Sequence, residues 1–151
     1  ALDPHPSNNF RASSLCLMTP NRAEAFALAK VPYQGGSGDP RSDRALLRAG
    51  HRLRQTWAPE HLLITLGADG MALFSGDDSL PAHIPTKAKQ VFDVSGAGDT
   101  VMATMVLAML AGASLPEAAE IANHAAGVVV GLVGTAAIDA DTLIASIDSP
   151  T

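Results

Sequence analysis

A chain of 151 residues with 47% apolar residues is long enough to form one domain with a hydrophobic core. Its net charge of −5 argues against a nucleic-acid partner, because no basic face is available to neutralise phosphates. Cys16 is the only cysteine, which excludes a disulfide framework, argues against a thiolate zinc site and favours a reducing compartment such as the cytoplasm.

The first elements follow from short local patterns. Residues 1–4 resemble the end of a strand followed by a turn, so we expect a segment to precede them. The apolar run 15–18 predicts a buried strand in which Cys16 is a small buried hydrophobe. Asn21 and Glu24 then have the spacing of a capping box and predict a helix over residues 22–30.

The middle of the chain alternates between helix and strand patterns. Ser42 or Asp43 can cap a helix that ends near residue 57. The apolar run 61–66 predicts a strand covered on both faces, and a glycine turn leads to a further strand over residues 71–75. The side chains that we expect on the buried face of the helix are Leu46, Leu47, Ala49, Gly50 and Leu53.

The last third of the chain reads as one strand followed by three helices. Residues 90–94 form a short apolar run, and residues 100–111 predict a long apolar helix. Ser114 with Glu117 predicts the start of the next helix, and residues 141–147 form the last one. No apolar stretch is long enough to span a bilayer, and the start lacks a signal peptide, so we expect a soluble protein. The histidines lack the spacing of a metal set.

A loop of small residues precedes the long apolar helix and carries the strongest chemical signal. Gly96, Ala97 and Gly98 let backbone N–H groups approach an anion without steric conflict. A helix that begins at Asp99 or Thr100 would direct its positive dipole end at the same point. The Asp99 carboxylate could accept the proton of a hydroxyl group there. The alternative is an ordinary tight turn with Asp99 as the helix cap, and the glycines alone do not distinguish the two.

Residues 93–99, DVSGAGD, resemble the second signature of the ribokinase-like (PfkB-type) carbohydrate kinases, which reads D-T-x-G-A-G-D. The resemblance implies that Asp99 is the catalytic base and that Gly96, Ala97 and Gly98 form the hole for the phosphoryl charge. It further implies that the first and third positions of the motif help to hold a monovalent cation, with K⁺ as the candidate.

Those two cation positions are Asp93 and Ser95 in this chain. Val94 between them stands where the family usually has Thr, a change that leaves the interpretation intact.

Two earlier segments also match the family, in the same order along the chain. Asn21 and Glu24 resemble its N-x-x-E element, which implies that Glu24 organises Mg²⁺ through water near the phosphates. Thr65, Gly67 and Gly70 resemble the T-x-G-x-x-G turn, which implies contact with the nucleotide phosphates and ribose. The alternatives are helix capping for the first pair and an ordinary strand-to-strand turn for the second.

A later segment resembles the adenine-pocket region of the same family. It comprises Asn123 to Gly127 and continues through residues 128–135, where the resemblance implies completion of the cation loop. Simple packing between helices is the alternative. Together these matches predict an α/β, three-layer αβα, ribokinase-like fold with a mostly parallel sheet, of which residues 1–151 are the C-terminal, nucleotide-binding half.

The resemblance implies transfer of the ATP γ-phosphoryl group to a sugar hydroxyl, with Mg²⁺. Residues 17–21, 92–101 and 125–135 resemble one subgroup, the heptose 7-phosphate kinase domains of bifunctional ADP-heptose synthases, which serve lipopolysaccharide synthesis. Another kinase of the family, acting on fructose, ribose, ketodeoxygluconate or a nucleoside, and a non-catalytic nucleotide-binding module are the alternatives. Because the family's sugar-binding half has no counterpart here, we expect the isolated chain to be inactive. An unpaired strand edge near residue 15 would favour self-association, for example as a homodimer.

Overall fold

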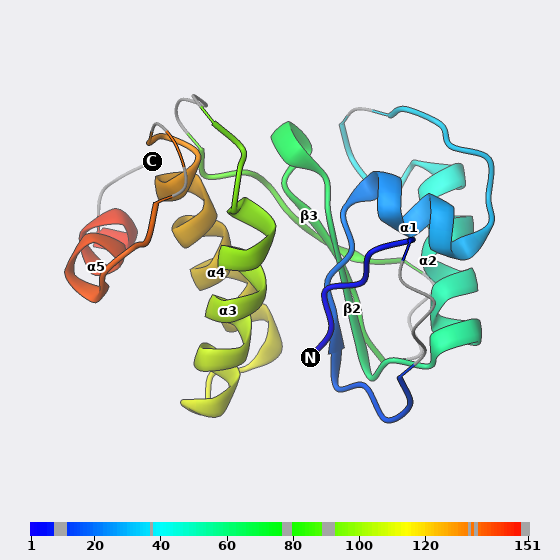
Figure 1. Cartoon of the computed structure of the whole chain (residues 1–151), viewed down its shortest axis with the longest axis horizontal. Helices are drawn as coiled ribbons and strands as arrows, with labels where there is room; N and C mark the ends of the chain where they lie inside the picture. Colours follow the sequence, from blue (N-terminus) through cyan, green and yellow to red (C-terminus); the bar gives the residue numbers. More distant parts are fainter. Residues whose placement is uncertain are drawn as a thin grey trace. The chain divides into compact units, whose positions relative to one another are not determined.

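The computed structural model describes residues 1–7, 12–36, 38–76, 80–88, 93–132, 134 and 136–148 (Figure 1). The chain divides into two compact units, Ala1–Pro85 and Thr86–Thr151. Each unit has its own secondary structure and is described by itself. Within the described residues, no helix is long and apolar enough to cross a membrane.

The first unit contains a four-stranded sheet. Its strands are β1 (Leu17–Met18), β2 (His61–Thr65), β3 (Met71–Phe74) and β4 (Ala82–Ile84), in the order β1-β2-β3-β4. β1 and β2 are parallel, whereas β2–β3 and β3–β4 are antiparallel. The described sheet is therefore mixed, where the sequence predicted a mostly parallel one. The physical reason is the short turn between β2 and β3, because a parallel pair needs a crossover of a dozen or more residues.

The free edge of β1 is partly covered by the start of the chain. Leu2 forms an isolated parallel bridge with Met18. The Leu2 amide donates to the Leu17 carbonyl at 2.9 Å, and the Thr19 amide donates to the Leu2 carbonyl at 3.1 Å. This pairing agrees with the expectation that residues 1–4 include the end of a strand, and it occupies part of the edge that the sequence left unpaired.

Two helices follow the strand β1 and the loop after it. α1 (Arg22–Ala29) has Asn21 as its N-cap, and α2 (Arg44–Trp57) has Asp43. Asp43 Oδ1 accepts hydrogen bonds from the first-turn amides of α2 at 3.0 Å, which identifies Asp43 rather than Ser42 as the cap. Asp43 Oδ2 also accepts from Arg22 Nη1 at 2.8 Å, so the two helix starts are linked by a partly buried ion pair.

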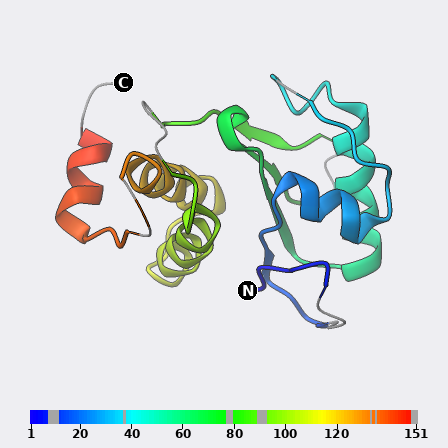
Figure 2. The same cartoon turned by 45° about the horizontal axis from the view of Figure 1, so that its top comes forward.

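α1 and α2 lie on the same side of the sheet (Figures 1 and 2), and the core of the unit lies between these helices and the strands. The side chains expected on the inner face of α2 are buried, except Leu47, which is partly buried. The largest members of this core cluster are Met18, Phe26, Leu46, Leu53, Leu62, Ile64 and Phe74.

Gly50 is the point of closest approach between α2 and the sheet. A Cβ atom at this position would overlap the ring of Phe74, which is 1% exposed and cannot move aside. The absence of a side chain at residue 50 therefore sets how closely α2 packs on β3.

The second unit is helical in its described part. α3 (Ala97–Leu110) and α4 (Leu115–Val129) form a hairpin, with the predicted Ser114–Glu117 capping box at the start of α4. α5 (Ala140–Asp148) packs on α4, where His124 Nδ1 and Ser146 Oγ are 3.1 Å apart. The strand predicted over residues 90–94 falls mostly outside the described residues, and Asp93 and Val94 are not in regular secondary structure.

We predict that Gly50→Ala destabilises the protein. The overlap with Phe74 outweighs the better helix propensity of alanine, for a net loss of about 1–2 kcal/mol in the free energy of unfolding. Urea denaturation followed by circular dichroism measures this loss. Arg48→Ala, on the exposed face of the same helix, is the control and should stay within about 0.5 kcal/mol of the parent. Equal stability of the two variants would contradict the packing argument.

Candidate functional site

The residues predicted to form a kinase site fall into two groups, one in each unit. In the first unit they gather at the carboxyl ends of β1 and β2. Asn21 and Thr65 form an isolated parallel bridge, and the Thr65 amide donates to the Pro20 carbonyl at 3.0 Å. Two segments more than forty positions apart in the sequence therefore lie side by side. In α/β folds this edge of the sheet is where ligands bind.

Asn21 and Glu24 form the capping box that their spacing predicts. Asn21 Oδ1 accepts from the Glu24 amide at 3.0 Å, and the Asn21 amide donates to Glu24 Oε2 at 2.8 Å. The capping interpretation is thus confirmed. The cap uses Oε2 of the Glu24 carboxylate, so it does not by itself preclude a second role for this side chain, and the Mg²⁺ role stays a prediction.

The glycine turn after β2 is the short 3-10 segment η1 (Gly67–Asp69) followed by Gly70. Gly67 has φ 62° and is exposed, with open space where a Cβ would be. Gly70 has φ 82° and ψ −125°, a conformation that L-residues rarely adopt, and it is buried. The Leu66 amide donates to the Gly70 carbonyl at 2.8 Å and closes the turn.

Contacts from two other segments hold this turn, and no local pattern predicted them. The Gly38 amide donates to Asp69 Oδ1 at 2.9 Å, and His83 Nε2 lies 2.8 Å from the Asp69 carbonyl oxygen. The loop between α1 and α2, which contains Gly38, and the strand β4 thus both fix the backbone of the predicted nucleotide turn. The strand-to-strand turn is confirmed as the connection of β2 to β3, and its contact with a nucleotide remains a prediction.

In the second unit, Asp93 joins the two segments predicted to form a cation loop. Its Oδ1 accepts from the Ser95 amide at 2.9 Å, and its own amide donates to the Val130 carbonyl at 3.3 Å. The pKa of Asp93 lies below its ordinary value, first because of the Ser95 amide, then the Ser95 hydroxyl, with a smaller contribution from the Gly134 amide. Ser95, Val130 and Gly134 therefore meet around Asp93, whose carboxylate is ionised.

The start of α3 differs from the prediction that it begins at Asp99 or Thr100. Gly96 is the N-cap, with φ 78°, and it makes no side-chain cap hydrogen bond. The positive φ lets the chain enter the helix at Ala97, so the small residues of the motif form the first turn itself. Thr100 donates both its amide and its hydroxyl to the Gly96 carbonyl at 2.9 Å.

Asp99 is the third residue of α3 and its side chain is exposed. The alternative in which Asp99 is the helix cap is therefore wrong. The first-turn amides of Gly98 and Asp99 have no intrahelical acceptor, and the N-cap Gly96 has no side-chain oxygen to offer them. An anion would find two amides without an intrahelical acceptor, the positive end of the helix dipole and a carboxylate in one turn.

Asn123 is buried within α4, at 3% exposure. Its burial favours the packing interpretation of this segment, and contact with adenine remains a prediction. Gly127, one turn further, lies so close to the backbone of Lys87 and Ala88 that a Cβ would be 3.2 Å from it. The segment 123–127 thus includes positions where small or buried residues serve close packing.

Cys16 is exposed, which corrects the prediction of a buried hydrophobe. Leu15, Leu17 and Met18 are buried, whereas Cys16 lies at a bend just before β1 and faces outward. The apolar run did not reveal this, because a continuous run does not say which residues face solvent.

We predict that Gly70→Ala destabilises the first unit by about 1–3 kcal/mol, because alanine must adopt a strained backbone conformation. Urea denaturation measures the loss. Gly67→Asn is the matched control, since asparagine tolerates the left-handed region and this site has open space, so its cost should be under about 1 kcal/mol. A Gly70→Ala variant as stable as Gly67→Asn would refute the assignment of strain to residue 70.

The pKa of Asp93 should depend on each of its hydrogen-bond donors in the order of their contributions. Because the Ser95 amide is the main cause of the lowered pKa, Ser95→Ala should raise the Asp93 pKa only part of the way to its ordinary value. Carbon-13 NMR of the carboxyl group measures it. Because the pKa of Asp93 is lowered in the folded state, ionised Asp93 stabilises the fold at pH values above its ordinary pKa. This stabilisation disappears as the pH falls through the lowered pKa. Full recovery of the ordinary pKa in Ser95→Ala would contradict the role of the amide.

Comparison with known protein families and structures gives a consistent result. Residues 10–143 match the family described as "pfkB family carbohydrate kinase". The chain is 42% identical to the bifunctional protein HldE of Pelobacter propionicus over 137 residues, covering 91% of this chain and 26% of that protein. It is 40% identical to HldE of Paramagnetospirillum magneticum, covering 97% of this chain and 28% of that protein. The chain thus spans about a quarter of the length of these curated relatives.

Solved structures agree on the fold. The chain superimposes on Arabidopsis thaliana ribokinase complexed with ribose and ATP with a TM-score of 0.75 at 26% identity, covering 89% of this chain and 41% of that one. Thermotoga maritima ribokinase gives 0.74 at 21% identity, covering 89% and 43% of the two chains. The α/β, ribokinase-like fold class predicted from the sequence is confirmed, and the chain belongs to the PfkB family of carbohydrate kinases.

Proposed function

We propose that this chain is the nucleotide-binding half of an ATP-dependent sugar kinase that works in the cytoplasm. Its membership of the PfkB family supports the class of reaction. The observation that carries the proposal is the start of α3, where a turn without a side-chain cap holds an exposed carboxylate, Asp99. A turn that only bound an anion would not need a negative charge beside it.

The anion in this proposal is the γ-phosphoryl group of ATP. Gly96, Ala97 and Gly98 are small enough for a phosphoryl group to approach the backbone. The Ala97 amide donates to the Val94 carbonyl at 3.2 Å, so the donors proposed for the phosphoryl group are the first-turn amides of Gly98 and Asp99. Phosphoryl transfer depends mostly on positioning and on stabilising charge that develops in the transition state. Fixed amide dipoles provide that stabilisation without reorganising during the reaction.

Asp99 is the general base of the proposed reaction. Its carboxylate accepts the proton of the acceptor hydroxyl as the oxygen forms a bond to the γ-phosphorus. The bond from that phosphorus to the oxygen bridging to the β-phosphate breaks, and ADP leaves with the electron pair. Exposure of the Asp99 side chain fits a group that must reach a substrate.

Two cations are part of the proposal. Mg²⁺, when bound, neutralises charge on the β- and γ-phosphates, and Glu24 would hold it through water, with one carboxylate oxygen already fixed by the helix cap. Asp93 and Ser95 would hold a monovalent cation such as K⁺. The ionised Asp93 carboxylate, where two loops meet, fits such a charge. A structural relative at 18% identity, Escherichia coli phosphofructokinase-2, was solved in complex with potassium.

Thr65, Gly67 and Gly70 are proposed to contact the nucleotide phosphates and ribose, and the Asn123 segment the adenine. Gly67 fits best, because it is exposed and has open space around it. Because the Asn123 side chain is buried, the proposed adenine contact would involve its backbone or neighbouring residues rather than this side chain.

We propose heptose 7-phosphate as the acceptor, phosphorylated at its 1-position on the way to ADP-heptose. The similarity to proteins named HldE supports this choice. Another sugar of the family remains the second candidate, because acceptor choice resides in a sugar-binding half that this chain does not contain. The part of the β1 edge that Leu2 does not pair with would favour self-association, and a homodimer is the proposed assembly.

Asp99→Asn should reduce kcat by about 10²- to 10⁴-fold, the contribution of a positioned general base. ATP affinity should stay within a factor of two or three, because asparagine keeps the size and removes only the base. The measurement is ADP release with heptose 7-phosphate, in the longer protein that the lengths of the relatives lead us to expect. Isothermal titration with an ATP analogue and Mg²⁺ measures nucleotide binding.

Asp141→Asn is the matched control, because Asp141 is also an exposed acid in the first turn of a helix. It should leave turnover unchanged. Substantial activity in Asp99→Asn would exclude Asp99 as the general base. Absence of nucleotide binding in the parent protein would contradict the kinase assignment itself. The same assay with fructose, ribose, ketodeoxygluconate and nucleosides tests the acceptor.

A further inference from the structure

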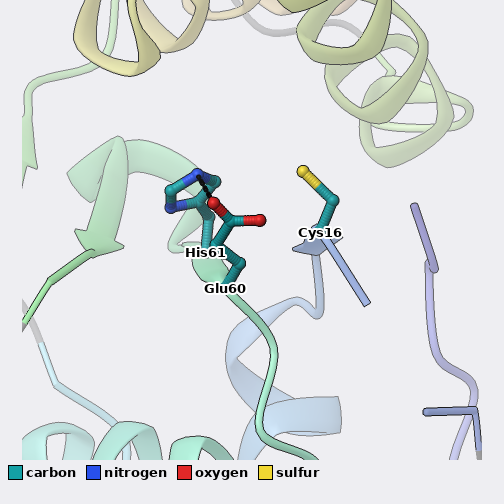
Figure 3. Close-up of side chains that lie close together, drawn as sticks. All are labelled: Cys16, Glu60 and His61. Carbon is teal, nitrogen blue, oxygen red and sulfur yellow. Dashed lines mark ion pairs between the residues drawn. The ribbon is translucent and has the colours of Figure 1, made fainter. Parts of the chain in front are cut away.

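Three side chains with metal-binding atoms meet at the amino ends of β1 and β2, away from the residues discussed above. The thiol of Cys16, a carboxylate oxygen of Glu60 and a ring nitrogen of His61 all lie within 4.8 Å of one another. Figure 3 shows the three side chains projecting to the same side, with the Glu60 carboxylate between the His61 ring and the Cys16 sulfur.

The backbone holds these residues together independently of any ligand. The Glu60 amide donates to the Leu15 carbonyl at 2.8 Å, and the His61 amide donates to the Cys16 carbonyl at 2.9 Å. These bonds extend the parallel register in which Leu17 pairs with His61. The cluster is therefore built into the sheet pairing, and the cost of bringing the two segments together is met by folding rather than by metal binding.

We propose that Cys16, Glu60 and His61 form a binding site for a thiophilic divalent cation of the Zn²⁺ class. Thiolate, imidazole and carboxylate are the three ligand types that zinc takes in proteins. A thiolate and an imidazole select against Mg²⁺ and Ca²⁺, which prefer oxygen ligands. Three protein ligands leave the fourth tetrahedral position to water, and binding releases the thiol proton to solvent.

The environment of His61 decides which nitrogen binds. Nδ1 is buried and has no hydrogen-bond partner among the residues that the structure describes. Nε2 faces Glu60, with Oε1 3.7 Å away. Nε2 is therefore the ligand atom, and its distance to Glu60 Oε1 is close to the separation of two ligands on one zinc ion. Because the Nδ1 proton would lack the acceptor that usually orients a zinc-bound histidine, the site should bind more weakly than a structural zinc finger.

Side-chain mobility allows the last adjustment. Glu60 is 68% exposed on its side chain and Cys16 is exposed, so both can move toward a cation without disturbing the core. His61 is the fixed member, at 21%. The set lies four residues, or about 13 Å, along β2 from Thr65 and the predicted nucleotide edge. The proposal is therefore independent of the kinase function.

Cobalt titration of the chain of 151 residues tests the site. Co²⁺ bound through a thiolate gives a near-ultraviolet charge-transfer band, and Zn²⁺ should displace it. Cys16→Ser should abolish the band and weaken Zn²⁺ binding at least tenfold, and Glu60→Gln should weaken binding while keeping the band. Zn²⁺ should also raise the melting temperature of the parent more than that of Cys16→Ser.

His5→Ala is the matched control, because His5 is exposed and outside the cluster. It should retain the cobalt band and the Zn²⁺ affinity of the parent. Circular dichroism confirms that each variant is folded. If Cys16→Ser does not fold, Glu60→Gln tests the site instead, because the Glu60 side chain is exposed. A parent without a charge-transfer band would overturn the proposal, as would equal Zn²⁺ affinity in the parent and both cluster variants.

Discussion

The parallel hydrogen bonding of β1 to β2 is the constraint on which both proposed sites of the first unit depend. It pairs Leu17 with His61 and extends beyond each strand end. At the carboxyl end the same register brings Asn21 beside Thr65, and at the amino end it brings Cys16 beside His61. A shift of one residue would turn the strand side chains to the opposite face and disperse both sets. The burial of the strands' apolar residues is what fixes that register.

In the second unit the feature of interest is the start of α3, where first-turn amides have no side-chain acceptor. A helix that starts with serine or aspartate satisfies its own first-turn amides. The helices α1 and α2 do so through the side chains of Asn21 and Asp43. At α3 the cap is Gly96, which makes the sharp entry into the helix and contributes no side-chain acceptor. The stability lost by omitting a side-chain cap would be the condition for the proposed binding of an anion there.

Local patterns predicted the local features well. The capping boxes and the buried face of α2 were visible in the sequence, because each depends on residues within one or two helical turns. The start of α3 was misplaced by two or three residues, since glycine at a positive φ can cap a helix as well as precede one. The outward direction of Cys16 was missed for a related reason, because an apolar run gives no phase for an extended segment of the chain.

Non-local features required the fold. Nothing in the sequence linked Cys16 to residues 60 and 61, because rules for metal-ligand spacing apply to ligands on one segment, and these come from two strands. The tether from Gly38 to Asp69 crosses the unit in the same way. The family resemblance supplied the proposed roles of Asp93 and Asp99 and implied that the segment after α4 completes the cation loop. The contacts of Asp93 with the Val130 carbonyl and the Gly134 amide could be read only from the folded loop.

Capping and catalysis need not compete for Glu24. The Asn21 amide holds one carboxylate oxygen at 2.8 Å, which restricts the side chain to one orientation before any ligand arrives. An unrestrained glutamate would lose side-chain entropy on binding a hydrated cation, and this cost is smaller for a side chain already held. The capping box would therefore strengthen the proposed Mg²⁺ role. In the structural interpretation of the N-x-x-E spacing, one oxygen of the Glu24 carboxylate caps the helix. In the proposed functional one, the other oxygen of the same carboxylate would face the hydrated cation.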